Sequence, residues 1–308
     1  MLLRSEMPNQ LDIPVVFLVF NRPELTSRVF ARIRDARPTT LFVVADGPRP
    51  DHPGDAEKCR RVRELIIRGV DWPCEVIRDF SEINLGTARR VPEGITNAFH
   101  MVTEAVILED DCLPDPTFFP FCAELLERHR DDPRVGQIAG DSFLEDYLPT
   151  SSSYYFTQYA YCWGWATWRR AWRLYDHTMS HWRGEEAATW LKERFPTRSE
   201  QRYWEYVLAA TAAGKIAAWD YRWTISLWAN RCVNVAPAVN LVKNIGFGPE
   251  ATNTFDGNSP DAFAMKFPLR HPAALIRDES ADEEAGRRVF RLPSFKTRLA
   301  NRIRRWLR

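Results

Sequence analysis

The sequence lacks most of the short motifs that identify common enzyme families. Six cysteines are present but contain no C-x-x-C pair, which excludes zinc ribbons and thioredoxin-like sites. No G-x-G-x-x-G or G-x-x-x-x-G-K-[ST] loop occurs, so a typical dinucleotide oxidoreductase and a P-loop kinase are excluded. H-E-x-x-H and G-x-S-x-G are absent as well. The scattered cysteines indicate buried thiols in a reducing compartment.

Long hydrophobic runs and an excess of one charge are also missing. No apolar segment approaches the roughly 20 residues that a membrane helix needs. Residues 1–14 have no continuous apolar stretch of the kind found in a signal peptide. The formal net charge is +1, so no whole-molecule field favours nucleic acid. We therefore expect a cytoplasmic protein, soluble or peripheral on the inner face of a membrane, that binds no nucleic acid.

What the sequence does contain is an alternation of buried strands and amphipathic helices. Apolar runs at residues 15–20, 41–45 and 105–108 are typical of buried strands, and residues 75–77 and 135–139 are further candidates for short strands. Helical patterns separate the first four of them, the first beginning near Pro23, and Asn84-Leu85-Gly86 marks a turn. This alternation predicts an α/β fold with a mostly parallel sheet flanked by helices.

Three consecutive acids give the sharpest functional signal. Glu109, Asp110 and Asp111 follow a buried strand directly, at the carboxyl edge of a parallel sheet, where open α/β sheets bind ligands. Since alternate residues of a strand share a face, Glu109 and Asp111 should point together and Asp110 the opposite way. Adjacent carboxylates repel unless a cation lies between them, and oxygen ligands suit Mn²⁺ or Mg²⁺. The alternative is an acidic turn on a solvated rim.

Four further residues lie where that edge could bind a nucleotide. Arg22 and Asp46 end two earlier strands, and an acid there can accept hydrogen bonds from a nucleobase or ribose. Asp46-Gly47-Pro48 is also a common turn. Arg89 and Arg90 stand near the start of a helix, a placement that suits a diphosphate. The alternative for this pair is two solvated arginines.

The second half of the chain is rich in tryptophan between residues 163 and 228. Within it, Asp220 stands among Trp219, Tyr221 and Trp223. Neighbouring rings would desolvate this carboxylate, raise its pKa and make it a better general base, and aromatic faces also suit sugar rings. The alternatives are a structural aspartate holding Arg222 and an aromatic core. Glu205 and Asp141 are reserve candidates for the base.

With these residues in place, the chain resembles a known family. The run 14–22, then Asp46, then the acid triplet followed by Phe118-Phe119, is similar to GT-A fold glycosyltransferases. The N-acetylglucosaminyltransferase I type and bacterial family-2-like enzymes are the most similar. The resemblance covers residues 13–255, and includes Trp163-Gly164-Trp165 and the loop 244–248.

The resemblance implies a role for each matched residue. Arg22 and Asp46 match positions that hold the nucleotide base, and Asp110 matches the ribose side of the acidic motif. Asp111 matches the metal-coordinating acid, and Asp220 matches the catalytic base. It implies transfer of a sugar from a nucleoside-diphosphate sugar to a hydroxyl of a glycan or glycolipid acceptor, with inversion, in bacterial surface polysaccharide or glycolipid synthesis. The lid after residue 244 departs from the pattern, so its ligand contacts are not carried over.

We expect one domain over residues 13–276, with a nucleotide-sugar half at 13–141 and an acceptor half and lid at 142–276. Two rival functions remain. A sugar nucleotidyltransferase needs a glycine-rich basic loop after the first strand, where this chain has Asn21-Arg22-Pro23-Glu24. A non-catalytic glycan-binding or assembly protein would not need an intact acid triplet.

Residues 277–308 are expected to form a basic tail. From residue 294 its apolar residues fall near one face of a helix and its arginines occupy the rest, which suits an anionic membrane surface. A helix packed on the domain and a disordered tail are the alternatives.

Overall fold

The computed structural model describes residues 10–144, 151–182, 184–247 and 259–290. Its centre is a sheet with the strand order β3-β2-β1-β4-β8-β6-β9-β7. The strands are β1 (Val15–Val19), β2 (Thr40–Ala45), β3 (Glu75–Phe80), β4 (Glu104–Glu109), β6 (Val135–Ala139), β7 (Tyr154–Thr157), β8 (Trp165–Trp168) and β9 (Val233–Pro237). A second pair, β5 (Cys112–Pro114) and β10 (Val242–Asn244), is antiparallel.

The predicted α/β fold with a mostly parallel sheet is confirmed. Strands β3, β2, β1 and β4 pair in parallel, and β6 pairs with β9 in parallel. Only β8 and β7 run antiparallel to their neighbours. The order 3-2-1-4 is the Rossmann-like arrangement, in which the sheet binds ligands at the carboxyl ends of its strands.

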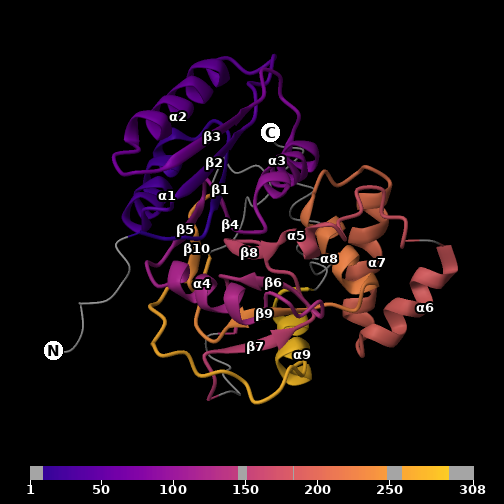
Figure 1. Ribbon diagram of the computed structural model, residues 1–308. Coiled ribbons are helices and arrows are strands. Elements are labelled where there is room, and N and C mark those ends of the chain that lie inside the picture. Colours follow the sequence, from indigo (N-terminus) through magenta and orange to yellow (C-terminus); the bar gives the residue numbers. More distant parts are fainter. Residues whose placement is uncertain (1–9, 145–150, 183, 248–258, 291–308) are drawn as a thin grey trace.

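Helices cover both faces of the first half. They are α1 (Pro23–Ala36), α2 (Asp55–Gly69) and α3 (Thr87–Met101). Helices α1 and α2 pack together on one side of the sheet and α3 lies on the other (Figure 1). Gly94 of α3 allows that close approach, because a Cβ there would stand 2.2 Å from Cγ1 of Val44.

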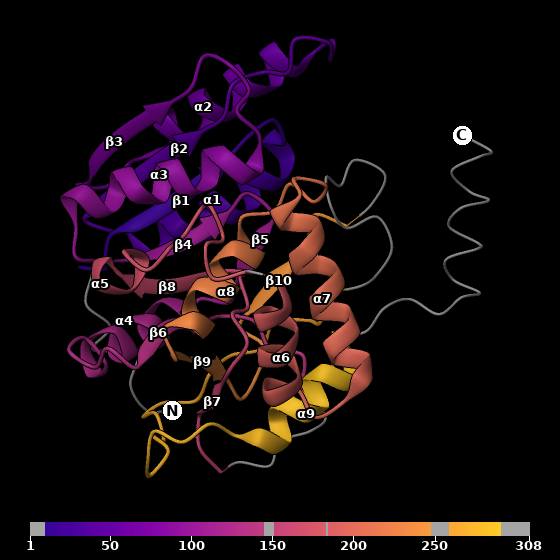
Figure 2. The ribbon, with the colours of Figure 1, turned by 90° about the vertical axis from the view of Figure 1, so that its right-hand side faces the viewer.

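Beyond α3 the chain forms further helices that the sequence periodicity did not delimit. They are α4 (Phe118–Arg128), α5 (Arg169–Trp172), α6 (Gly184–Arg194), α7 (Arg198–Ala212), α8 (Asp220–Ala229) and α9 (Glu279–Arg288). Figure 2 shows α6, α7, α8 and α9 grouped on one side. Their aromatic side chains form a second hydrophobic cluster around the buried Trp204, Trp228 and Phe195.

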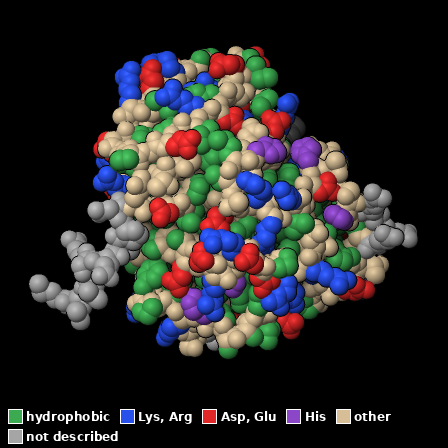
Figure 3. Space-filling view, viewed as in Figure 1, with side chains coloured by type: hydrophobic (Ala, Val, Ile, Leu, Met, Phe, Trp, Pro, Cys, Tyr) green, Lys and Arg blue, Asp and Glu red, His purple; other side chains and the backbone are tan. Residues whose placement is uncertain are grey.

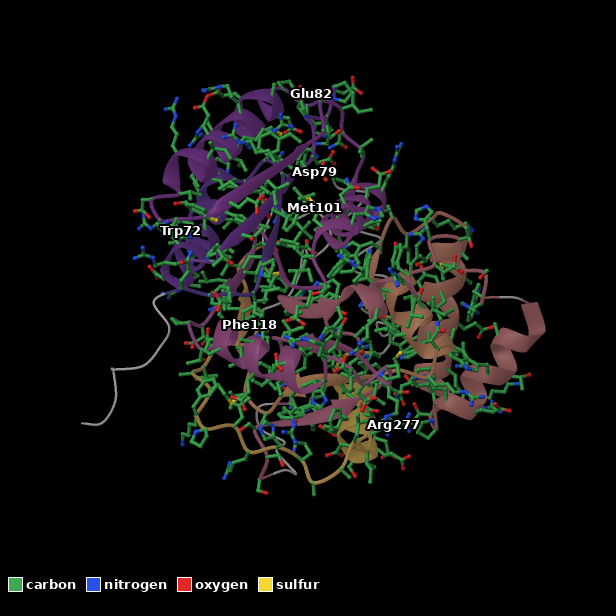
Figure 4. The ribbon with its side chains drawn as sticks, viewed as in Figure 1. Trp72, Asp79, Glu82, Met101, Phe118 and Arg277 are labelled. Carbon is green, nitrogen blue, oxygen red and sulfur yellow. The ribbon has the colours of Figure 1, made fainter. Side chains whose placement is uncertain are left out.

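The predicted tail begins with packed structure. Ala281 and Ala285 of α9 are buried, and Asp282 accepts hydrogen bonds from the Thr157 hydroxyl and the Gln158 N–H. Arg277, labelled in Figure 4 beside α9, pairs with Asp282 at 3.4 Å. Residues 277–290 are therefore part of the domain. The amphipathic stretch 294–308 lies outside the described residues.

No helix in the described ranges has the length and apolar character that crossing a bilayer would require. On the face seen in Figure 3, acidic and basic side chains are largely interspersed. That pattern agrees with the small net charge.

Candidate active site

A cavity of about 370 Å³ opens at the carboxyl edge of the sheet. Both halves of the chain contribute to it. From the first half come Arg22, Thr87, Glu109, Asp111 and Asp141, and from the second half Trp163, Tyr203, Asp220, Tyr221, Gly246 and Phe290. The volume is in the range of small-molecule sites, roughly 300–1,000 Å³. The topology therefore brings the acid triplet and Asp220 to one cavity, although they are far apart in sequence.

The acid triplet has the alternating orientation that its position on a strand predicts. Glu109, the last residue of β4, and Asp111 both line the cavity. Asp110 is buried and turns to the end of β1, where its Oδ2 accepts a hydrogen bond of 3.2 Å from the N–H of Phe20. The three neighbouring acids thus lie in two different environments.

Arg22 is the cation of this cluster. Its Nη1 donates to Oδ2 of Asp111 at 2.7 Å and lies 3.7 Å from Oδ1 of Asp110. Arg22 directly precedes α1, so the first helix fixes the backbone that presents it. The sequence placed Arg22 at this edge, but the direct pairing with Asp111 is visible only in the structure.

The loop after β10 closes over Asp111. Strand β10 pairs with β5, and beyond it the N–H of Ile245 donates to the Asp111 carbonyl at 2.8 Å. A Cβ at Gly246 would stand 2.1 Å from Oδ2 of Asp111. Glycine is required at this point because any side chain would collide with the carboxylate. The loop 244–247 is thereby placed at the acidic motif, as expected of a lid.

Crowding of the acids has a clear electrostatic signature. Burial raises the pKa of Glu109 to about 8, and repulsion from Asp111, Asp110 and Asp220 adds to the effect. Burial also raises the pKa of Asp110 to about 7, against the opposing attraction of Arg22. Among the described residues, burial and mutual repulsion of these carboxyl groups therefore outweigh the attraction of the Arg22 guanidinium and favour their protonated forms.

Carboxyl groups crowded in this way supply the oxygen ligands that suit a hard divalent cation such as Mn²⁺ or Mg²⁺, whose charge would favour their ionised forms. Within the described ranges, however, no three His, Cys, Asp or Glu side chains converge on one point where a metal ion could sit. Mg²⁺ is commonly held by only one or two carboxylates together with substrate phosphates. A metal on Asp111 would thus need oxygens from the donor, and would compete with Arg22 for the carboxylate.

Asp220 begins helix α8 and lines the cavity. Burial raises its pKa, which makes the carboxylate a stronger base. The alternative in which Asp220 serves to hold Arg222 is not what the structure shows. The guanidinium of Arg222 donates instead to the carbonyls of His177 at 3.0 Å and Ala218 at 2.6 Å.

The two reserve candidates have different surroundings. Asp141, at the end of β6, lines the cavity and is only 2% exposed. Its Oδ1 has no hydrogen-bond partner among the described residues, and the same holds for the buried Tyr161 hydroxyl beside the cavity. Glu205 is exposed on α7 and does not line the cavity. Asp141 is therefore the better second acid.

Asp46 holds a loop. Its carboxylate accepts four hydrogen bonds, from the backbone N–H groups of Gly47, Leu85 and Gly86 and from the Asn84 side chain, at 2.8–3.1 Å. Asp46 therefore stabilises a turn, as the alternative interpretation predicts. Its binding of a nucleotide base stays a prediction.

The two arginines proposed for the diphosphate do not line the cavity. Arg90 is buried and donates to the Asp79 carbonyl, and to its Oδ1 at 2.7 Å, beside α3 (Figure 4). These hydrogen bonds join α3 to the sheet, and because consecutive side chains of a helix point in different directions, Arg89 does not share this position. Arg89 is exposed and pairs with Glu93 at 2.6 Å.

Sequence reasoning missed most of the aromatic wall. Tyr203 and Trp204 come from α7, and Phe290 comes from beyond the expected end of the domain. The Phe290 ring lies 4.8 Å from that of Trp204 and 5.8 Å from that of Tyr203. The density of tryptophan pointed to this region, but no local pattern distinguished cavity residues from core residues.

Comparisons with known proteins extend the description only a little. No protein-family model and no curated protein matches the chain. One solved structure that matches is a UDP-glucose pyrophosphorylase complexed with UDP-glucose, with a TM-score of 0.28, 10% identity, and coverage of 49% of this chain and 63% of that one. Another is the inositol-1-phosphate CTP transferase from T. maritima, with a TM-score of 0.32, 10% identity, and coverage of 54% and 74%. The chain spans less than two thirds of the first structure, and TM-scores this low leave the activity open.

Proposed function

We propose that this chain is a metal-dependent glycosyltransferase. It would move a sugar from a nucleoside-diphosphate sugar to a hydroxyl of a glycan or glycolipid acceptor, with inversion. The observation that supports this most is the single cavity that combines Glu109 and Asp111 with Asp220 and a wall of aromatic rings. A cation bound by the acids would hold the diphosphate of a donor, and the aromatic rings would pack against the apolar faces of sugars.

Each group in the cavity has a distinct task in this reaction. Asp220 accepts the proton of the acceptor hydroxyl while the oxygen of that hydroxyl bonds to the anomeric carbon of the donor sugar. The bond from that carbon to the diphosphate breaks, and the nucleoside diphosphate leaves. Arg22 stands beside Asp111, where its positive charge would stabilise the departing phosphate. When bound at Asp111, Mn²⁺ or Mg²⁺ would supply Lewis-acid stabilisation of the same charge.

A sugar nucleotidyltransferase is the second candidate, because both structures named above are enzymes of that class. The two reactions release different products. A glycosyltransferase releases a nucleoside diphosphate from its donor, whereas a nucleotidyltransferase releases pyrophosphate from a nucleoside triphosphate and a sugar phosphate. A non-catalytic glycan-binding protein releases neither.

The test is to screen UDP-glucose, UDP-N-acetylglucosamine, GDP-mannose and dTDP-rhamnose with Mn²⁺. Thermal stabilisation identifies the donor, because a ligand that binds only the native state raises its stability. Release of nucleoside diphosphate from that donor is then measured with and without chelator. We expect metal-dependent release. Pyrophosphate release from the matching triphosphate and sugar 1-phosphate would instead establish the second candidate.

A further inference from the structure

A second cleft, of about 480 Å³, lies between α3 and α5 and shares no residue with the cavity described above. Helix α3 contributes Phe99 and His100 to its lining. The segment that starts at α5 contributes Arg169, Trp172, Arg173 and Tyr175. None of the residues that line the cleft is acidic.

The floor of the cleft is a rigid aromatic surface. The rings of Trp172 and Tyr175 are stacked, with centroids 4.6 Å apart and an interplanar angle of 12°. Phe99 lies 6.4 Å from Trp172. The indole N–H of Trp172 donates to Oγ1 of Thr96 at 2.9 Å, which fixes the ring against α3. Phe99 and Trp172 are almost fully buried, so Tyr175 is the aromatic side chain that remains accessible in the cleft, and this packing holds it rigid.

The rim of the cleft has unpaired positive charge. Arg169 is anchored through Nε to the Val102 carbonyl at 3.0 Å, and its Nη groups have no partner among the described residues. The guanidinium of Arg173 also has none within the described ranges. Nearby arginines are paired, as with Arg89 and Glu93 at 2.6 Å and Arg130 and Glu104 at 2.8 Å. Figure 3 shows basic and histidine side chains gathered over the region of α3 and α5.

Tyr175 adds a neutral donor to this charge. Its hydroxyl is buried and has no hydrogen-bond partner in the described part of the chain, although the residue lines the cleft. Buried polar groups are nearly always satisfied in folded proteins, so an unmatched hydroxyl in a cleft that Arg169 and Arg173 also line calls for an acceptor.

We propose that the cleft between α3 and α5 binds a phosphate monoester carried on a flat ring. Guanidinium groups bind phosphate oxygens with charge-assisted, often bidentate hydrogen bonds. The ring of the ligand packs against Tyr175, and the phosphate lies at the rim between Arg169 and Arg173. This site is independent of the reaction proposed for the larger cavity.

The experiment is calorimetric titration of the full chain with phenyl phosphate, inorganic phosphate and phenol. Phenyl phosphate should bind more tightly than inorganic phosphate, and phenol should not bind measurably. Arg173→Glu should weaken phenyl phosphate binding about 10- to 100-fold, the range expected when a charge-assisted hydrogen bond is lost. Arg68→Glu, an equal change of charge at a side chain that is 80% exposed on α2, should leave it unchanged.

A further variant separates the cleft from the catalytic cavity. Arg22→Gln removes the cation beside Asp111, and phenyl phosphate binding should survive it. If Arg22→Gln abolishes binding while Arg173→Glu does not, the anion binds in the catalytic cavity and the proposal is wrong. Equal affinity for phenyl phosphate and inorganic phosphate would remove the role of the aromatic floor. Binding of anionic vesicles, with no binding of phenyl phosphate, would overturn the proposal too.

Discussion

At the scale of single residues, the site crowds carboxyl groups together in a way that does not favour the stability of the fold. Glu109, Asp110 and Asp111 are adjacent acids, and burial raises the pKa of Glu109 and of Asp110. Only Arg22 compensates them directly within the described residues. Perturbed carboxyl groups of this kind cluster at functional sites, since a purely structural cluster would be more stable with fewer charges.

Asp111→Asn tests the assignment of the metal. The variant keeps the size of the side chain but loses the charge that attracts a cation, so metal-dependent donor binding should disappear. Calorimetry of the identified donor with and without Mn²⁺ measures it. Asp35→Asn, at an acid whose side chain is 63% exposed on α1, is the matched control. Unchanged metal dependence in Asp111→Asn would place the metal elsewhere.

Asp220→Asn tests the general base. Turnover should fall roughly 10²–10⁴-fold, the usual contribution of such a group, because the amide cannot accept the proton. The dissociation constant of the donor should barely change. Steady-state kinetics and donor titration report the two quantities separately.

Two further variants show whether a loss of turnover in Asp220→Asn is specific to Asp220. Glu205→Gln, at the exposed reserve candidate, should behave like the wild type. If Asp220→Asn keeps its turnover and Asp141→Asn loses it, the base is Asp141. A parallel loss of donor affinity and turnover in Asp220→Asn would move the residue to a binding role.

At the scale of elements, the loop after β10 is fitted closely to the acidic motif. Gly246→Ala would put a Cβ 2.1 Å from Oδ2 of Asp111, so the loop or the carboxylate must move. We expect donor affinity to fall about tenfold or more, because misplacement of a positioning group is costly. Gly214→Ala controls for a general loss of stability, because φ at Gly214 is +70°, where a side chain is strained, and the residue does not line the cavity. Equal affinity in both variants would show that the loop does not position Asp111.

Helix α4 ends at Arg128, and the next residue, His129, gives the fold a predicted sensitivity to acid. Burial lowers the pKa of His129 to about 4, and Arg128 adds to the effect. The folded chain thus binds fewer protons than the unfolded chain between pH 6.5 and pH 4. Stability is full above pH 6.5 and falls as the pH drops through this window. We expect the residue to account for about 1–2 kcal/mol, less than the full linkage because some solvent reaches it.

Urea denaturation at pH 7 and pH 4.5 measures this contribution. His129→Phe keeps a ring near Tyr154 and Phe156 but cannot take up a proton, so it should lose less stability than the wild type on acidification. His52→Asn, at an exposed histidine, should follow the wild type. The same pH dependence in all three chains would mean that His129 does not titrate in this window.

At the scale of the whole molecule, the end of the domain decides how the tail can be tested. Because α9 and Phe290 pack against the second half, truncation must come after Phe290 rather than before residue 277. The full chain should float with anionic vesicles and the truncated chain should not. Each basic residue near such a surface contributes about 1 kcal/mol, which salt screens. Equal flotation of both chains would exclude residues 291–308 as a membrane anchor.

The sequence by itself determined the first half of the fold and the location of the acidic motif. Strands β1, β2 and β4 were predictable because each contains a short, uninterrupted apolar run. The opposed directions of Asp110 and of its two neighbours follow from the alternation of a strand, which is a local property. Arg22 could be placed at the same edge because parallel strands end together.

Only the tertiary structure decided which of these residues share the cavity. Arg90 and Asp46 looked like ligands in sequence, yet their hydrogen bonds go to Asp79 and to the loop at residues 84–86. Phe290 enters the cavity from beyond the expected domain, because its contacts with Tyr203 and Trp204 are long-range. Periodicity reports which side of an element is buried, but not what buries it. Partners that are far apart in sequence are selected by packing of the whole chain.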